Sequence, residues 1–505
     1  MEKKNYYAVI GAGPVGYVLS ILLALRGFKV ELFEKRPDPL TTSQSGEWRS
    51  TNLKIIKRSY PALRRVGVFE EFLNYSIEMF QIKTILQNQD EFEILFRGNL
   101  PGSTSYSINR VEIQEILARR IQDFQDNIIV HYNACISNVQ IDQQSFDVKY
   151  SDGKIETKRG YEMVFGTDGI HSAVQQAFLT KPGFSYSREY NGYGYTELQI
   201  PALETQEGSK FRIQQNTFFH WPRNNVDVHM WGLPNFAGDI NIGLFMKVTG
   251  EHSFEYFKKS GFDVFQKFMF EYFPDSKLLM PNMKDYFDKC NLTRIVTMKC
   301  GPWKFGNFQL VGESAHAQNP FGGLGFNASM EECVMIDDLI DKYQCDWNLI
   351  CDDLYKSRKL TADKMNEFGD QQFTLYKDQL YDEPVQISLI LQDYLSRVYS
   401  DIFQSSSQFI RFDDKDFLEC LKFIPVENQL IDDLVKLIPD ILDLAKTSRF
   451  DQRVFEIVDK YRNLTELASF KNQKSNIKID KQNGYAFENL FAKYMSSYKQ
   501  YTPEI

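Results

Sequence analysis

Hydrophobic positions at the start of the chain follow a strand, helix, strand order. Tyr6–Ile10 is a short apolar run, as expected for a parallel strand that is buried on both faces. An apolar pattern with helical spacing continues to Leu25, and a second apolar run covers Lys29–Phe33. The pattern therefore predicts a β-α-β unit at the start of the chain.

The turn between the first strand and the helix is rich in glycine. Gly11-Ala12-Gly13-Pro14-Val15-Gly16 fits the pattern GxGxxG. Gly11 suits the tight turn, Gly13 lets the backbone approach a pyrophosphate, and Gly16 lets helix and strand pack closely. Glu34 ends the second strand, where a carboxylate can accept hydrogen bonds from a ribose. The unit is typical of dinucleotide binding, and by itself it leaves FAD and NAD as alternatives.

Two later segments favour FAD. The apolar run Tyr161–Phe165 leads into Gly166–Ser172, and Phe308–Val311 leads into Gly312–His316 and the glycine-rich segment Pro320–Asn327. An acid after the second strand can hold a ribityl hydroxyl. The N–H groups at the start of the following helix can face the electron-rich end of an isoalloxazine ring. His316 lies inside this turn, so we expect it to be structural.

The chain resembles the FAD-dependent aromatic hydroxylases, which are single-component flavin monooxygenases, and among them the kynurenine 3-monooxygenase group. The resemblance covers roughly residues 5–370 and a short stretch near Arg449. It is carried by the motifs above together with Trp48–Leu53, Ala62–Gly67, Arg110, Tyr195–Pro201, Trp221–Asn224, Leu233–Asn235, Leu244–Met246 and Gly312–Cys333.

This resemblance implies an α/β fold: a Rossmann-type FAD-binding domain with an inserted mixed β-sheet substrate domain and a helical C-terminal region. It also implies that NADPH reduces FAD and that oxygen reaches an aromatic substrate through a flavin hydroperoxide. No metal site and no certain catalytic side chain are expected. The expected FAD-binding residues are Gly11, Gly13, Pro14, Val15, Gly16, Glu34, Lys35, Arg36, Arg49, Arg110, Asp168, Gly169, Gly312, Glu313, Pro320, Gly323, Leu324, Gly325, Phe326 and Asn327.

The substrate positions depart from the resembled group, in which an arginine and two tyrosines hold the substrate carboxylate. Ile82 stands at the arginine position. Thr104 stands at the first tyrosine position, with Tyr106 two residues away, and Phe450 stands at the second. The clamp is therefore predicted to be lost, unless the register is shifted by one residue and Lys83 serves instead.

Three flavin-side positions also differ from the resembled group. Glu313 replaces an aspartate, Gln175 replaces an arginine and Leu324 replaces a glutamine. With these changes we still expect the chain to bind FAD, but turnover with NADPH is less strongly predicted.

The domain organisation is predicted from the same pattern. The FAD-binding domain takes residues 1–72, 105–180 and 300–345, and a substrate-side sheet takes 73–104 and 181–299. Alternating segments such as Phe211–Gln215 and Val226–Trp231 suit that sheet. Residues 346–470 are predicted to be helical, with Pro425 and Pro439 as interruptions. Residues 471–505 are predicted to form a linker and an amphipathic helix, which docks on its own domain or on a protein partner or membrane surface.

Composition limits the other functions. The 505 residues carry a formal net charge of −9 and show no basic stripe, so nucleic-acid binding has little support. The seven cysteines lack metal-type spacing, which favours a reducing compartment, either cytoplasmic or mitochondrion-associated. The uncharged stretch Tyr6–Leu25 is broken by glycines, so we expect neither a transmembrane segment nor a secretory signal.

Two functions remain open from the sequence. The first is an NADPH-dependent monooxygenase that hydroxylates kynurenine or a less acidic aromatic substrate. The alternative is a catalytically silent FAD-binding homologue that serves as a structural or accessory subunit of a larger assembly, mitochondrial or elsewhere. A flavin reductase or oxidase is a third, weaker option.

Overall fold

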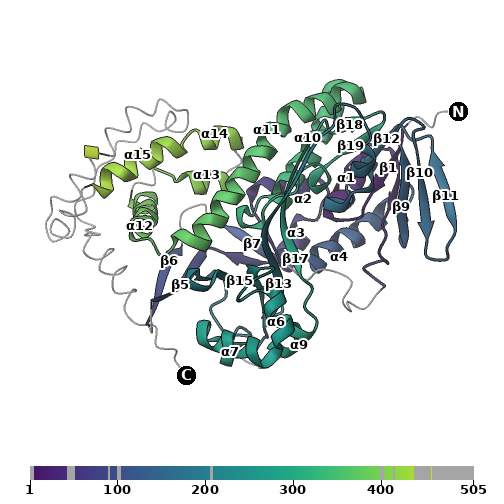
Figure 1. Cartoon of the computed structure of the whole chain (residues 1–505). Coiled ribbons are helices and arrows are strands. Elements are labelled where there is room, and N and C mark those ends of the chain that lie inside the picture. Colours follow the sequence, from purple (N-terminus) through teal and green to yellow (C-terminus); the bar gives the residue numbers. More distant parts are fainter. Residues whose placement is uncertain are drawn as a thin grey trace.

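The structure is a computed structural model that describes residues 5–41, 52–88, 91–98, 104–204, 209–398, 403–412, 416–436 and 456–457. Figure 1 shows a parallel sheet with its helices on one side, a larger sheet beside it, and a group of C-terminal helices at the far end. The functional cavity lies where the two sheets meet.

A mainly parallel sheet carries the N-terminal β-α-β unit. Its strand order is β18-β19-β12-β1-β2-β8, so β1 lies between β12 and β2. Only β18 runs antiparallel to its neighbour. The strands are β1 (Tyr6–Ile10), β2 (Lys29–Phe33), β8 (Ile128–His131), β12 (Met163–Gly166), β18 (Lys304–Phe305) and β19 (Phe308–Leu310).

Three long helices cover this sheet. Helix α1 (Pro14–Leu25) contacts both α4 (Arg110–Ile121) and α10 (Gly325–Tyr343), and the three share one hydrophobic core with β1 and β2. Most of α1 is buried, because it is apolar on nearly every side and has neighbours on nearly every side. The glycine turn after β1 is thereby held at the centre of the domain.

A seven-stranded mixed sheet forms the second layer, with the order β17-β13-β16-β15-β14-β5-β6. One face packs on a hydrophobic cluster with the short helices α6 (Phe254–Ser260), α7 (Phe262–Tyr272), α8 (Ser276–Leu279) and α9 (Met283–Asp288). The opposite face turns toward the cavity. The strands are β5 (Gln81–Asn88), β6 (Glu91–Gly98), β13 (Ser185–Ile200), β14 (Thr217–Arg223), β15 (Val228–Pro234), β16 (Ile240–Lys247) and β17 (Thr293–Gly301).

Two three-stranded sheets complete the β structure. The sheet β3-β7-β4 joins the two large layers, and the sheet β11-β10-β9 lies at the outer edge of the FAD-type domain (Figure 1). The first is formed by β3 (Asn52–Ile55), β4 (Ile77–Met79) and β7 (Ser105–Asn109), and the second by β9 (Ala134–Gln140), β10 (Ser145–Tyr150) and β11 (Ile155–Arg159). Short helices α2 (Tyr60–Arg65) and α3 (Phe69–Asn74) lie between β3 and β4 along the chain, and α5 (Ala173–Phe178) follows β12.

The C-terminal region is helical where it is described. It contains α11 (Trp347–Thr374), a π-helical turn (Leu375–Gln379), α12 (Glu383–Val398), α13 (Ser406–Phe412), α14 (Phe417–Leu421) and α15 (Ile424–Val435). The buried side chain of Arg58 connects this region to the domain that contains the parallel sheet. Its Nε donates to the carbonyl of Ile410 at 2.9 Å, and its Nη1 lies 2.8 Å from Glu331 Oε1.

The predicted α/β fold class with a helical C-terminal region is confirmed, and two local predictions are wrong. Phe211–Gln215 is not a strand, and the neighbouring strand begins at Thr217. Pro425 does not interrupt a helix but lies in the first turn of α15, where its missing N–H costs no hydrogen bond. The predicted linker and amphipathic helix at 471–505, and Pro439, lie outside the described residues. The domain boundaries stay a prediction.

Glu31 joins three parts of the sheet region and gives the fold a pH dependence. Its carboxylate accepts from Tyr6 at 2.6 Å and lies 2.9 Å from His131 Nε2 and 3.6 Å from Lys158 Nζ. Burial alone would raise the pKa of Glu31, but these three partners outweigh it and hold the pKa at about 2, below the ordinary 4.5. The carboxylate therefore stabilises the fold above about pH 4.5, and this contribution is lost as the pH falls toward 2.

We predict that Glu31→Gln lowers the free energy of unfolding at pH 7 by on the order of 3 kcal/mol. The difference from the wild type should shrink steadily between pH 5 and pH 3 in urea unfolding followed by circular dichroism. Glu156→Gln is the control, since that carboxylate also pairs with Lys158 but lies nearer to solvent, where ion pairs contribute little. A Glu31→Gln effect that is independent of pH would contradict the assignment.

Candidate flavin and substrate site

The glycine turn after β1 is packed against the end of β12. Gly11 has φ +100°, and a Cβ on it would lie 2.7 Å from the Cα of Asp168. A Cβ on Gly16 would lie 1.9 Å from the carbonyl oxygen of Gly11, so only glycine fits there. Gly13 differs, because a Cβ on it would meet nothing within 4 Å. The open space beside Gly13 is where a pyrophosphate can approach the start of α1.

Glu34 is tied to this turn from the end of β2. Its Oε2 accepts from the backbone N–H of Ala12 at 2.9 Å, and its Oε1 accepts from the backbone N–H of Arg36 at 2.9 Å. The side chain is buried, so its remaining lone pairs are fixed in direction beside the turn. A ribose hydroxyl that approached there could donate to them.

The second motif meets the third across the ends of β12 and β19. Asp168 accepts from the backbone N–H of Ala173 at 2.7 Å, and the backbone N–H of Gly169 donates to Ser314 Oγ at 2.9 Å. Burial raises the pKa of Asp168. Gln175 is buried, and its Nε2 donates to the carbonyl of Ser314 at 2.8 Å. It therefore holds the third motif against the second.

His316 lies behind the third motif. Its Nε2 is 2.5 Å from Glu332 Oε1, and Glu332 Oε2 accepts from the backbone N–H of Gly312 at 2.9 Å. Burial opposes ionisation of Glu332, but His316 and Arg358 outweigh it and lower the pKa of that carboxyl. His316 is not among the residues that line the cavity. This is the placement of a structural residue.

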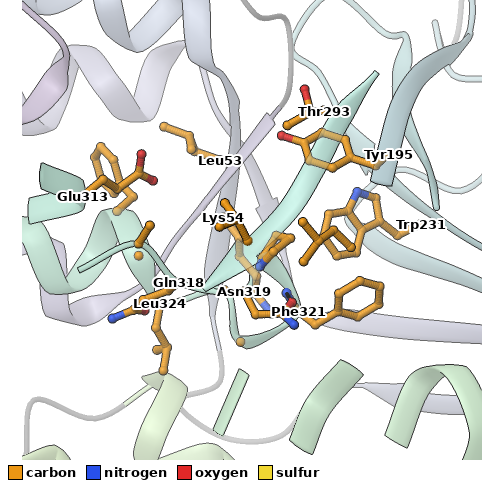
Figure 2. Close-up of a pocket in the computed structure, with 18 of the residues that line it drawn as sticks. Leu53, Lys54, Tyr195, Trp231, Thr293, Glu313, Gln318, Asn319, Phe321 and Leu324 are labelled. Atoms are coloured by element: carbon orange, nitrogen blue, oxygen red, sulfur yellow. Dashed lines mark hydrogen bonds between the residues drawn. The ribbon is translucent and has the colours of Figure 1, made fainter. Parts of the chain in front are cut away.

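A cavity of about 480 Å³ opens beside these motifs (Figure 2). On one side it is lined by the start of α10 and the loop before it. The expected FAD residues that line it are Arg110, Glu313, Pro320, Gly323, Leu324, Gly325, Phe326 and Asn327. Helix α10 has no side-chain cap at its first turn, so its N–H groups are available to a ligand.

The opposite wall of the cavity is aromatic, and the sequence did not reveal it. Phe218 and His220 come from β14, and Trp231 comes from the neighbouring strand β15. The ring of His220 stacks on Tyr376 of the π-helical turn at 4.5 Å. The sequence shows that alternate side chains along these strands share a face. It does not show which face meets the cavity, because that depends on how the sheet packs. The wall is formed by Tyr195, Phe218, His220, Trp231, Phe321 and Tyr376.

The predicted substrate positions differ in where they lie relative to the cavity. Ile82 pairs with Phe218 across β5 and β14, so it shares the face of the aromatic wall, whereas Lys83 pairs with Phe219 on the other face. Thr104 immediately precedes β7. Tyr106 does not line the cavity, and its ring packs on Tyr60 and Phe72. Phe450 and the expected FAD residue Arg49 lie outside the described residues.

The residues present fit FAD. The start of α1 has open space beside Gly13, and the cavity beyond it is flanked by the start of α10. Arg110 lines this cavity, and its buried Nε has no hydrogen-bond partner among the described residues, as expected of a guanidinium that holds an anionic ligand. Glycine turn, buried acid and aromatic-walled cavity together define a flavoprotein of the aromatic hydroxylase class.

Comparison with known proteins narrows this class. A family model described as "FAD binding domain" matches residues 6–225. The kynurenine 3-monooxygenase of Flavobacterium johnsoniae is 30% identical over 476 residues, which cover 91% of this chain and all of that protein. The enzyme of the same name from Christiangramia forsetii is 28% identical over 463 residues, with the same coverage. The chain belongs to the kynurenine 3-monooxygenase family of FAD-dependent aromatic hydroxylases.

Solved structures agree on the fold. A tetrameric form of 2-methyl-3-hydroxypyridine-5-carboxylic acid oxygenase aligns with a TM-score of 0.58 at 17% identity, over 78% of this chain and 98% of that one. The tetracycline destructase Tet(51) aligns with a TM-score of 0.56 at 16% identity, over 79% and 98%. Among the helices that the structure describes, none has the length and apolar character needed to cross a membrane.

We predict that Gly13→Ala separates folding from FAD binding. Gly13 has φ −70°, a conformation open to any residue, but it is the N-cap of α1, where alanine is less favourable than glycine; apo Gly13→Ala should therefore be about as stable as the wild type. The added methyl group should nevertheless displace the pyrophosphate, and the purified protein should lose its flavin absorbance. Gly16→Ala is the contrast, expected to lower apo stability as well because of its backbone clash. Full FAD retention in Gly13→Ala would contradict this placement of the pyrophosphate.

Proposed function

We propose that this chain is an FAD monooxygenase that uses NADPH to hydroxylate an aromatic substrate. One cavity is lined both by Glu313 with the glycine-rich start of α10 and by the aromatic wall, and this observation carries the proposal. A ring bound against that wall lies beside the space available to the flavin. The family relationship supports the same reaction class, since the relatives are named as monooxygenases.

Each motif has a task in this proposal. The turn at Gly11–Gly16 and the start of α1 would hold the pyrophosphate, Glu34 would hold the ribose, and Arg110 would supply a cation. Glu313 lines the cavity, where its carboxylate can accept a hydrogen bond from a ribityl hydroxyl. When bound, FAD accepts a hydride from NADPH and activates oxygen for transfer to the aromatic ring.

The aromatic wall would bind the substrate ring and keep water out. The ring centroid of Trp231 lies 4.2 Å from that of Phe245 and 5.1 Å from that of Phe321, so neighbouring rings support the wall. Behind it, His229 Nε2 lies 3.2 Å from His220 Nδ1. Burial, with a smaller contribution from Arg223, lowers the pKa of His229 to about 3, so His229 is neutral at physiological pH.

One assay tests the reaction. The purified protein should show flavin absorbance and should oxidise NADPH faster when an aromatic substrate is added, with a hydroxylated product in the mass spectrum. Kynurenine and a panel of aromatic acids and phenols serve as substrates, and Gly13→Ala serves as the flavin-free control. An FAD-loaded protein that consumes no NADPH with any of them would contradict the proposal.

The predicted loss of the carboxylate clamp is tested separately with Ile82→Arg. Ile82 shares a face with Phe218, so an arginine there should raise kynurenine affinity about tenfold or more, the usual effect of a charge-assisted hydrogen bond. The measurement is a titration of the flavin absorbance with kynurenine. Lys83→Arg is the matched control, because it places the same group on the opposite face and should give no gain. An equal gain in both variants would contradict the assignment of Ile82.

A further inference from the structure

Lys54 is a cation at the centre of the cavity. It lies on β3 between Leu53 and Ile55, which belong to the hydrophobic core around α1, and the half-buried Lys54 lines the cavity together with Leu53. Figure 2 shows it between the flavin side, marked by Leu53 and Glu313, and the aromatic wall, marked by Tyr195 and Trp231. Its Nζ lies 5.2 Å from the ring centroid of Phe218.

The backbone of Lys54 is held in place from α10. Asn327 Nδ2 donates to the carbonyl of Lys54 at 3.0 Å, and the backbone N–H of Ile56 donates to Asn327 Oδ1 at 3.0 Å. One amide side chain thus binds the strand on both sides of Ile55. Because Asn327 also belongs to the helix start that faces the flavin, Lys54 has a fixed position relative to both walls.

The described lining of the cavity carries more cations than acids. Among the described residues that line it, the cations are Lys54, Arg110, Arg188, Arg294 and Arg411, and the acid is Glu313. Arg188 lies over Tyr190 at 5.4 Å, and Arg411 donates to Gln372 at 2.6 Å. Among these cations, Lys54 has its ammonium over a ring of the aromatic wall, and His229 behind that wall is neutral.

We propose that Lys54 is a specificity-determining residue that binds a carboxylate attached directly to the substrate's aromatic ring. A substrate ring against Phe218 would bring such a group within reach of the ammonium, and a charge-assisted hydrogen bond between the two is about twice as strong as a neutral one. The same ammonium repels the α-ammonium of an amino acid. The cavity therefore prefers simple aromatic acids to zwitterionic aromatic amino acids. This inference rests on the proposed function, since it assumes that the aromatic wall is the substrate site.

Benzoate and benzamide test the inference, because they match in size and differ in charge. Isothermal titration of the FAD-loaded protein with each compound should give at least about tenfold tighter binding of benzoate. Lys54→Met should bind the two compounds equally, and Lys54→Arg should keep most of the preference. Arg188→Met is the matched control, since it removes another cation of the same cavity, and it should leave the preference unchanged.

Three outcomes would overturn the inference. They are equal or absent binding of the two compounds by the wild type, a preference that persists in Lys54→Met, and loss of FAD from Lys54→Met, which would assign the lysine to the cofactor. Binding is measured without NADPH, so this result is independent of turnover. A protein that binds benzoate through Lys54 but oxidises no NADPH with any aromatic compound would contradict the proposed function and support the role of Lys54.

Discussion

The close approach of three backbone segments at the end of β1 governs the arrangement of the site. Gly11 touches the backbone of Asp168, and Gly16 touches the carbonyl of Gly11, with no room for a Cβ at either position. The contact fixes the direction in which α1 leaves the sheet. It also brings the end of β12 beside the turn, and with it the Ser314 segment that Gly169 and Gln175 hold. A dinucleotide site needs this proximity, since one extended ligand must meet all three motifs.

A second constraint joins the flavin side to the substrate side. Asn327 binds the backbone of β3 from the start of α10. Asn52, two residues before Lys54, donates through Nδ2 to Ser107 Oγ at 2.8 Å and to Asn235 Oδ1 at 2.7 Å. Strand β3 is therefore tied to α10, to β7 and to the end of β15. The relative position of the two walls of the cavity is therefore set by hydrogen bonds to the same short strand.

The sequence predicted what depends on local pattern. The strand, the glycine turn and the helix between Tyr6 and Leu25 follow from apolar spacing and from backbone geometry that only glycine allows. The aromatic wall could not be predicted, because Phe218 and Trp231 meet only after two strands pair and the sheet packs on the cavity. Phe211–Gln215 shows the opposite error, a strand that was predicted but is not formed. Its residues alternate as in a strand, but it does not pair with any strand of the described sheet. Lys54 was missed for the same reason as the wall, because one lysine on a four-residue strand gives no signal until the strand is placed.

We infer that the flavin ring and the substrate ring bind against opposite walls of one cavity. A crystal structure of the protein with FAD and benzoate tests this most directly. We expect the isoalloxazine to lie beside Gly323–Asn327. The benzoate ring should pack against Phe218 and Trp231, with its carboxylate bound to Lys54 Nζ. Density for FAD at the glycine turn, with its ring system outside the cavity and benzoate bound elsewhere, would contradict it.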